Sequence, residues 1–184
     1  MSRFDNTSFK NPHFKDLAAF KDEYQRSISD SKYFLNKAKQ ELCWFHEPTR
    51  SNEGTFTSPR WFNDGKINIS YNCIDRHAEK TPNKTAIIWQ GDQQDQSEYI
   101  SYQILQEKVS KLANGLKEIG VAKGDRVCIY MPMIPEAAFA MFACMRIGAI
   151  HSVVFGGFSP EAIKSRILDS DCQFIVTTDE GTRG

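Results

Sequence analysis

The sequence predicts an α/β fold, in which a mostly helical N-terminal extension (1–80) precedes the start of a parallel-sheet βαβ domain (81–184). Polar and aromatic residues dominate the chain as far as Thr81, whereas short apolar runs alternate with helical patterns after Pro82. Strands that alternate with helices of about 10–15 residues are typical of βαβ units, whose parallel sheet is covered on both faces.

In the extension, apolar residues recur at helical spacing twice. This spacing predicts one helix from about Pro12 to Arg26 and another from about Asp30 to Leu42. The segment Glu47–Arg60 is rich in Pro, Thr, Ser, Asn and Gly and is expected to be irregular. A short helix is expected from about Ser70 to Lys80.

The first half of the predicted domain begins with an apolar run, Lys84–Gln90, which is expected to be a buried strand, and Glu98–Ser101 is a second short strand candidate. The helix that follows is the best specified element, with Ser101 as its N-cap and Gly120 just past its end. Its apolar residues are spaced by three and four and share one stripe: Tyr102, Leu105, Val109, Leu112, Leu116 and Ile119.

The second half alternates strands with helices. The expected strands are Arg126–Met131, Ile150–Phe155 and Gln173–Thr177, and the expected helices are Pro135–Ile147 and Ser159 to about Leu168. Proline fits the first helical position, where its missing donor costs nothing. The helix Pro135–Ile147 is apolar nearly all round, so we expect it to be buried on more than one side.

Composition excludes several classes of protein. Lys plus Arg and Asp plus Glu both number 23, so the net charge is zero, which disfavours a nucleic-acid surface or a polybasic membrane anchor. No apolar stretch approaches the roughly 20 residues that cross a bilayer, so no membrane association is expected. Five scattered cysteines and the absence of a signal-peptide core favour reduced thiols and a cytoplasmic location.

Two segments after predicted strands are candidate ligand contacts, because ligands of such sheets bind beyond the carboxyl ends of the strands. Gly156 and Gly157 either contact a phosphate through their backbone or only turn the chain; they match neither common phosphate-loop motif. Arg183, beside Gly184, either grips a phosphate with its forked guanidinium or is solvated. Since both segments follow consecutive parallel strands, we expect them to face one crevice.

Other chemistry is weakly indicated. Cys43-x-x-His46 and Cys73-x-x-x-His77 have spacing that suits zinc, but core packing is the simpler use of these residues, and no metal site is predicted. The chain has no G-x-S-x-G motif and no arrangement of nucleophile and base. We therefore assign no catalytic residue.

Longer blocks carry a resemblance. The segment Trp61–His77 closely resembles the W-F-x-G-G-x-x-N-x-S-Y-N-x-x-D-R-H block of the AMP-forming acetyl-coenzyme A synthetase family, with Asp64 in place of the block's first glycine. Four more segments are similar to that family: Tyr24–Trp44, Ile87–Asp92, Met131–Ala137 and His151–Ala162. Two shorter ones, Ile100–Leu105 and Gly120–Val127, resemble the wider adenylate-forming superfamily.

The resemblance implies an acetate–CoA ligase. Such enzymes use Mg²⁺ and ATP to convert acetate to an acetyl-adenylate, releasing pyrophosphate, and then transfer the acetyl group to CoA, releasing AMP. The family's ATP-binding and catalytic motifs lie later in its chain, so this sequence is expected to be an inactive N-terminal fragment with no ligand bound. By the resemblance, the residues that contact the nucleotide part of CoA are Phe155, Gly156, Gly157, Arg183 and Gly184.

Alternatives remain. A propionyl-CoA synthetase fragment is one, although Phe158–Ala162 favours acetyl; a non-catalytic module that binds CoA or another adenine nucleotide is a second. A dinucleotide-binding oxidoreductase is disfavoured because no G-x-G-x-x-G follows the first strand. An isolated fragment is expected to have an unpaired sheet edge and an uncovered face on the helix Pro135–Ile147, and hence low solubility.

Overall fold

A computed structural model describes residues 13–181 and confirms the α/β fold class. Contacts divide the chain into two compact units, residues 1–67 and 68–184. None of the described helices is both long enough and apolar enough to span a bilayer.

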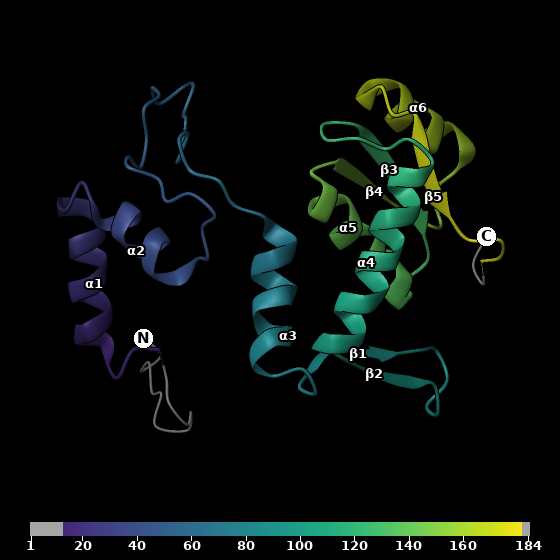
Figure 1. Ribbon diagram of the computed structural model, residues 1–184, viewed down its shortest axis with the longest axis horizontal. Helices are drawn as coiled ribbons and strands as arrows, with labels where there is room; N and C mark the ends of the chain where they lie inside the picture. The colour runs from purple at the N-terminus through teal and green to yellow at the C-terminus, as the bar shows by residue number, and fades with distance from the viewer. Residues whose placement is uncertain (1–12, 182–184) are drawn as a thin grey trace, which may run out of the picture. The chain divides into compact units, whose positions relative to one another are not determined.

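The described part of the first unit contains two helices, α1 (Leu17–Ser29) and α2 (Tyr33–Glu41), followed by irregular chain (Figure 1). The helix α1 begins at Leu17 because the Asp16 side chain accepts a hydrogen bond from the Ala19 N–H at 2.8 Å and so caps it. The predicted start at Pro12 lies outside the described residues. All residues of both helices are exposed or half-exposed, so the described part of this unit has little core.

The second unit opens with a π-helical turn, η1 (Tyr71–Asp75), that continues into α3 (Arg76–Lys80). Ile74 is completely buried in the main core, and the Asn68 side-chain amide donates to the Met145 and Arg146 carbonyls at 3.2 and 3.0 Å. These contacts group the helical segment with the α/β part of the chain, although its sequence pattern resembles that of the extension (1–80). The compact unit defined by contacts starts at Asn68, and the division after residue 80 stays a prediction.

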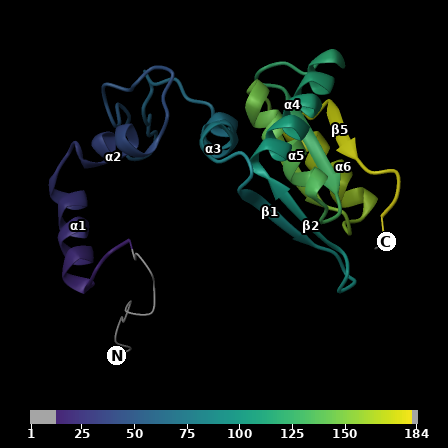
Figure 2. The ribbon, with the colours of Figure 1, turned by 60° about the horizontal axis from the view of Figure 1, so that its bottom comes forward.

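The strands β1 (Thr85–Gln90) and β2 (Ser97–Ser101) form an antiparallel hairpin that is separate from the parallel sheet (Figure 2). The expectation that the Lys84–Gln90 run is a buried strand is wrong: none of its strand residues is buried, and Ile88 is 64 % exposed. A short loop joins the two strands, and such a loop allows antiparallel pairing without a crossover helix.

The helix α4 (Tyr102–Glu118) confirms the predicted caps. The Ser101 hydroxyl accepts from the Ile104 N–H at 3.3 Å, and Gly120 has the positive φ of 96° that favours glycine. The predicted apolar stripe is correct along most of the helix, but the prediction that it includes Ile119 is wrong, because Ile119 is the C-cap and is 66 % exposed. Ala113, which the predicted stripe omits, is buried.

The parallel sheet has the strand order β4-β3-β5, with β3 (Arg126–Met131) in the centre, β4 (Ile150–Phe155) on one side and β5 (Phe174–Thr177) on the other. Figures 1 and 2 show these strands among α4, α5 (Pro135–Ile147) and α6 (Pro160–Ser170). The predicted strand and helix positions are thus confirmed, with ends that differ by one or two residues.

The two faces of the sheet are covered by different helices. Val127, Ile129 and Met131 belong to the main core cluster, which they share with residues of α4 and α5. Cys128 and Val154 point to the opposite face, where Ile163 and Ile167 of α6 cover them.

The helix α5 is buried on more than one side, as its sequence predicts. Glu136 is its one exposed residue. The expectation that an isolated chain leaves one face of this helix uncovered is wrong, because α4 packs along α5 and all residues of α5 except Glu136 are buried or half-buried.

Candidate functional site

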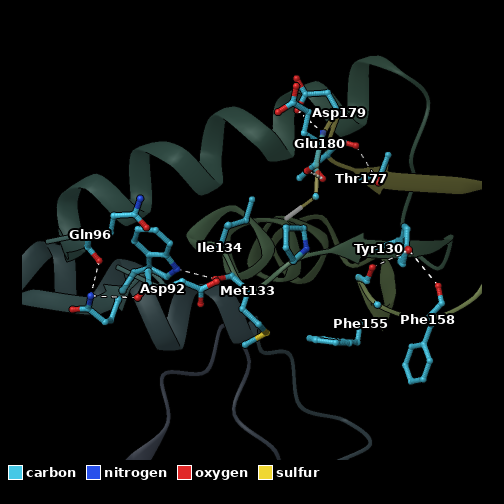
Figure 3. A pocket seen from close by; sticks show the side chains of 18 of the residues that line it. Asp92, Gln96, Tyr130, Met133, Ile134, Phe155, Phe158, Thr177, Asp179 and Glu180 are labelled. Atoms are coloured by element: carbon cyan, nitrogen blue, oxygen red, sulfur yellow. Dashed lines mark hydrogen bonds between the residues drawn. The ribbon is translucent and has the colours of Figure 1, made fainter. Parts of the chain in front are cut away.

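A cleft of about 970 Å³ lies at the carboxyl ends of the parallel strands. Four chain segments line it: the tip of the β1–β2 hairpin, the loop after β3, the turn between β4 and α6, and the loop after β5. In Figure 3, Asp92 and Gln96 of the hairpin lie on one side of the cleft, and Tyr130, Phe155 and Phe158 lie on the other. Ligands of open parallel sheets bind in this position.

The structure brings together three of the predicted site residues. Phe155, Gly156 and Gly157 all line the cleft, and so does the loop after β5 as far as Gly181. The predicted shared crevice therefore exists for the described part of both segments. Arg183 and Gly184 lie outside the described residues.

The two segments follow strands that are consecutive along the chain, but these strands are not neighbours in the sheet. β4 and β5 both pair with β3 and are separated by it. They nevertheless end at one edge of the sheet, because all three strands are parallel. The loop after β3, with Pro132, Met133 and Ile134, therefore forms the floor between them.

The glycine turn is packed tightly against the centre of the sheet. A Cβ atom on Gly156 would lie 3.2 Å from the Pro132 nitrogen and 3.3 Å from the Met131 carbonyl carbon, both of which are backbone atoms. Glycine is thus needed here for close approach of two chain segments. This constraint is separate from any contact that the glycines make with a ligand.

Tyr130, which the sequence analysis did not single out, ties this turn to β3. Its hydroxyl lies 3.0 Å from the Gly156 carbonyl oxygen and 3.3 Å from that of Phe158 (Figure 3). Tyr130 lies near the end of an apolar strand, and nothing in that local sequence indicates this role. The two carbonyls come close to the hydroxyl only through the fold of the turn after β4.

The helix α6 starts at the cleft with a regular cap. The Ser159 hydroxyl accepts from the Ala162 N–H at 3.3 Å, and Pro160 occupies the first turn, as the sequence predicts. The aromatic ring of Phe158 meets that of Phe155 edge-on at 6.4 Å between centroids. The Arg166 guanidinium lies 5.2 Å from the centre of the Phe158 ring, which stabilises the ring at the rim.

The sequence analysis also did not predict that the β1–β2 hairpin forms one wall of the cleft, through residues 89–93 and Gln96. The Trp89 indole N–H donates to the Met133 carbonyl at 2.8 Å and so fastens the hairpin to the floor of the cleft. The Gln90 side-chain amide lies within hydrogen-bonding distance of three carbonyls, those of Gly91, Gln93 and Gln96, and holds the loop at the tip.

The described lining carries negative charge only. Its charged side chains are Asp92, Asp179 and Glu180, and none of the described lining residues is Lys, Arg or His. The Thr178 hydroxyl donates to the Glu180 carbonyl at 2.7 Å and orders the loop that presents two of these carboxylates. A phosphorylated ligand in this cleft therefore requires a cation from another part of the protein.

Two buried cysteines, Cys128 and Cys144, are unsuited to thiolate chemistry. Burial raises the pKa of the Cys144 thiol to about 11, and burial is also the main cause that raises the pKa of Cys128. Burial lowers the pKa of His151 on β4, so this imidazole is neutral near pH 7. Within residues 13–181, no group of three or more His, Cys, Asp or Glu side chains is arranged to hold a metal ion.

Comparisons with known proteins match both units. Residues 20–73 match the model "Acetyl-coenzyme A synthetase N-terminus", and residues 74–184 match the model "AMP-binding enzyme". These matches confirm the resemblance drawn from the sequence blocks.

Curated relatives carry the same name. An acetyl-coenzyme A synthetase of Gamma-proteobacterium EBAC31A08 is 54 % identical over 175 residues, covering 95 % of this chain and 27 % of its own length. One from Rhizobium meliloti (strain 1021) is 52 % identical over 178 residues, with the same two coverages. Acetyl-coenzyme A synthetase 2 of Pseudomonas aeruginosa is 50 % identical over 175 residues, covering 89 % of this chain and 26 % of its own length.

The chain thus spans about 27 % of the length of these relatives. The AMP-binding enzyme model matches residues 74–184, which is more than half of the chain and includes every residue that lines the cleft. On that match, the chain belongs to the AMP-binding enzyme family.

Proposed function

We propose that this chain supplies the CoA-side part of an acetate–CoA ligase, which converts acetate, ATP and CoA to acetyl-CoA, AMP and pyrophosphate in the cytoplasm. The observation that carries the proposal is the cleft, in which the glycine turn after β4 and the loop after β5 face each other. The names of the similar proteins support the choice of acetate.

In this proposal, the Phe155–Gly157 turn and the segment that ends at Arg183 and Gly184 contact the nucleotide part of CoA. Phe155 is 49 % exposed and offers an apolar ring surface at the rim of the cleft. Because the described lining is acidic, Arg183 supplies the cation that a phosphate of CoA requires. This proposal assigns no residue of this chain to ATP or Mg²⁺.

A chimera tests the proposal. We would replace the N-terminal segment of the Gamma-proteobacterium EBAC31A08 relative by this chain, which is 54 % identical to it. The chimera is expected to form acetyl-CoA from acetate, ATP and CoA. A chimera that folds and performs acetate-dependent ATP–pyrophosphate exchange, yet accepts no CoA, would refute the assigned role.

The variant Arg183→Ala in the same chimera tests whether Arg183 binds a phosphate of CoA. Loss of a charge-assisted hydrogen bond is expected to weaken CoA binding by about 1.5–3 kcal/mol. The KM for CoA should therefore rise, whereas the rate of acetate-dependent ATP–pyrophosphate exchange should stay nearly unchanged. An unchanged KM for CoA would exclude Arg183 from the site.

The chain by itself is expected to form no acetyl-adenylate. Catalytic residues have been assigned neither by the sequence nor by the site geometry, so acetate-dependent pyrophosphate release should stay at the level of a reaction without protein. Measurable release by the purified 184-residue chain would contradict this expectation.

A non-catalytic module that binds CoA or another adenine nucleotide is a second candidate. It is favoured by one observation, namely that every residue lining the cleft belongs to the second compact unit. Calorimetry distinguishes the two, because an autonomous module binds CoA tightly, whereas the ligase proposal expects little heat from this chain alone. A propionyl-CoA ligase remains an alternative that propionate and acetate kinetics of the chimera would separate.

A further inference from the structure

We infer that Tyr130 is a positioning residue, whose hydroxyl holds the Phe155–Phe158 turn in the conformation that receives the nucleotide part of CoA. The inference rests on the proposed function, because it assigns the tyrosine to the same cleft. It adds a residue on β3, which lies outside both segments that the sequence pattern indicated.

The position of Tyr130 suits this role. It is the next-to-last residue of the central strand, paired in register with Val154 of β4 and Thr177 of β5. From there its hydroxyl reaches over the end of β4 to the Gly156 and Phe158 carbonyls, at 3.0 and 3.3 Å. A phenol hydroxyl has one proton to donate. The nearer Gly156 carbonyl oxygen is therefore its main acceptor, and the Phe158 carbonyl oxygen is a second, weaker acceptor of the same proton.

The target of the hydrogen bond is the part of the turn that most needs restraint. Two successive glycines lose more conformational freedom on ordering than any other pair of residues. Because the peptide unit is planar, fixing the Gly156 carbonyl also fixes the direction of the Gly157 N–H. No described residue accepts a hydrogen bond from that N–H, so it is free to bind a ligand.

The hydroxyl has no role in packing that would explain it otherwise. The ring of Tyr130 packs against the cluster formed by Cys128, Val154 and Cys172 below α6. Phenylalanine would fill that space equally well. The hydroxyl group therefore acts by ordering the turn. Without it the glycines become ordered only when the ligand binds, and the entropic cost of that ordering makes the binding free energy less favourable.

The test compares Tyr130→Phe with Tyr99→Phe, which removes the same atom from a 65 % exposed side chain on β2, outside the cleft. The KM for CoA is measured in the chimera of the proposed function, without a change and with each of the two variants. In the ¹⁵N-labelled 184-residue chain, the relaxation order parameters of Gly156 and Gly157 report ordering of the turn.

We expect Tyr130→Phe to raise the KM of the chimera for CoA about fivefold, the effect of one hydrogen bond. The Gly156 and Gly157 order parameters should fall from about 0.85 to below about 0.6, while those of β3 and α5 stay unchanged. Tyr99→Phe should match the wild type in both measurements. A loss of order spread over β3 and α5 would show a merely structural role and overturn the inference.

Other outcomes are also decisive. Unchanged CoA affinity and unchanged glycine order in Tyr130→Phe would overturn the inference and leave the proposed function standing. If the chimera folds and performs acetate-dependent ATP–pyrophosphate exchange but accepts no CoA, the proposed function fails and the inferred role fails with it. The order parameters would still show whether the hydroxyl restrains the turn.

Discussion

Asp75 and Arg146 form the most buried of the ion pairs among the described residues, with side chains 11 % and 24 % exposed. The guanidinium contacts both carboxylate oxygens, and the Gln106 amide donates to one of them at 2.8 Å. The pair thereby links η1, α4 and the last turn of α5. Removing one partner leaves a charge in a largely buried place without its counter-charge, which costs more than the pair contributes.

We therefore expect Arg146→Met to lower the free energy of unfolding of the second unit by about 2–3 kcal/mol, measured by urea denaturation. The control Asp171→Asn removes the ion pair with Arg126, in which the aspartate side chain is 80 % exposed. Its effect should stay within about 1 kcal/mol. Equal effects of the two variants would show that burial does not strengthen the first pair.

Asp64 makes two hydrogen bonds within the first unit. Its carboxylate accepts from the Thr49 hydroxyl at 2.6 Å and from the Thr49 N–H at 2.9 Å. These hydrogen bonds, the hydroxyl first, hold the pKa of Asp64 below its ordinary value of 3.8. The carboxylate joins two stretches of irregular chain in the first unit.

A lowered pKa means that the charged form favours folding. The stabilisation by Asp64 is present above pH 3.8 and should be lost as the pH falls through the lowered pKa. The Thr49 amide shift, followed by NMR from pH 6 downwards, should therefore titrate together with Asp64. In Asp64→Asn the same shift should be independent of pH over this range, and a shift that titrates as before would assign the effect to another group.

The helix α4 shows how a cap and an interior glycine differ. Ser101→Ala removes the side chain that caps the helix and should lower the free energy of unfolding by about 1 kcal/mol. Gly115→Ala should raise it by about 0.5–1 kcal/mol, because a Cβ atom there meets nothing within 4 Å and alanine restricts the unfolded chain. Urea denaturation measures both, and changes of the same sign in the two variants would contradict the argument.

Most elements of the second unit could be predicted because their signals are local. Apolar spacing defines α4 and α5, and capping residues mark where α4 and α6 begin. The hairpin could not be placed in the same way. The run Lys84–Gln90 has the composition of a buried strand, but its partner is the nearby β2, and composition does not specify which strand pairs with which.

The described part of the first unit has almost no interior. Among residues 13–67, Pro48 alone is buried, whereas the second unit surrounds β3 with a core from α4, α5 and η1. Since burial of apolar surface is the main stabilising contribution, the first unit should open far more easily. Hydrogen exchange measured by mass spectrometry should show complete exchange of α1 and α2 well before β3, and equal protection of the two units would contradict this.

About half of the site was accessible from the sequence. The rule that ligands bind beyond the ends of parallel strands correctly indicated the turn after β4 and the loop after β5, and the cleft contains both. The roles of Tyr130 and of the β1–β2 hairpin could not be predicted from the sequence. Tyr130 contributes through a hydrogen bond to the turn after β4, and the hairpin is held at the cleft by the hydrogen bond from Trp89 to Met133. Such contacts depend on tertiary placement, which leaves no periodic trace in a sequence.

The fastening of Trp89 at the rim of the cleft has a practical consequence. The chain has three tryptophans, and Trp44 and Trp61 belong to the first unit, so replacing those two with phenylalanine leaves a single emitter beside the cleft. Its indole N–H is held by the Met133 carbonyl. Any molecule that fills the space or shifts that loop changes the surroundings of the indole, and intrinsic fluorescence then reads occupancy without a label.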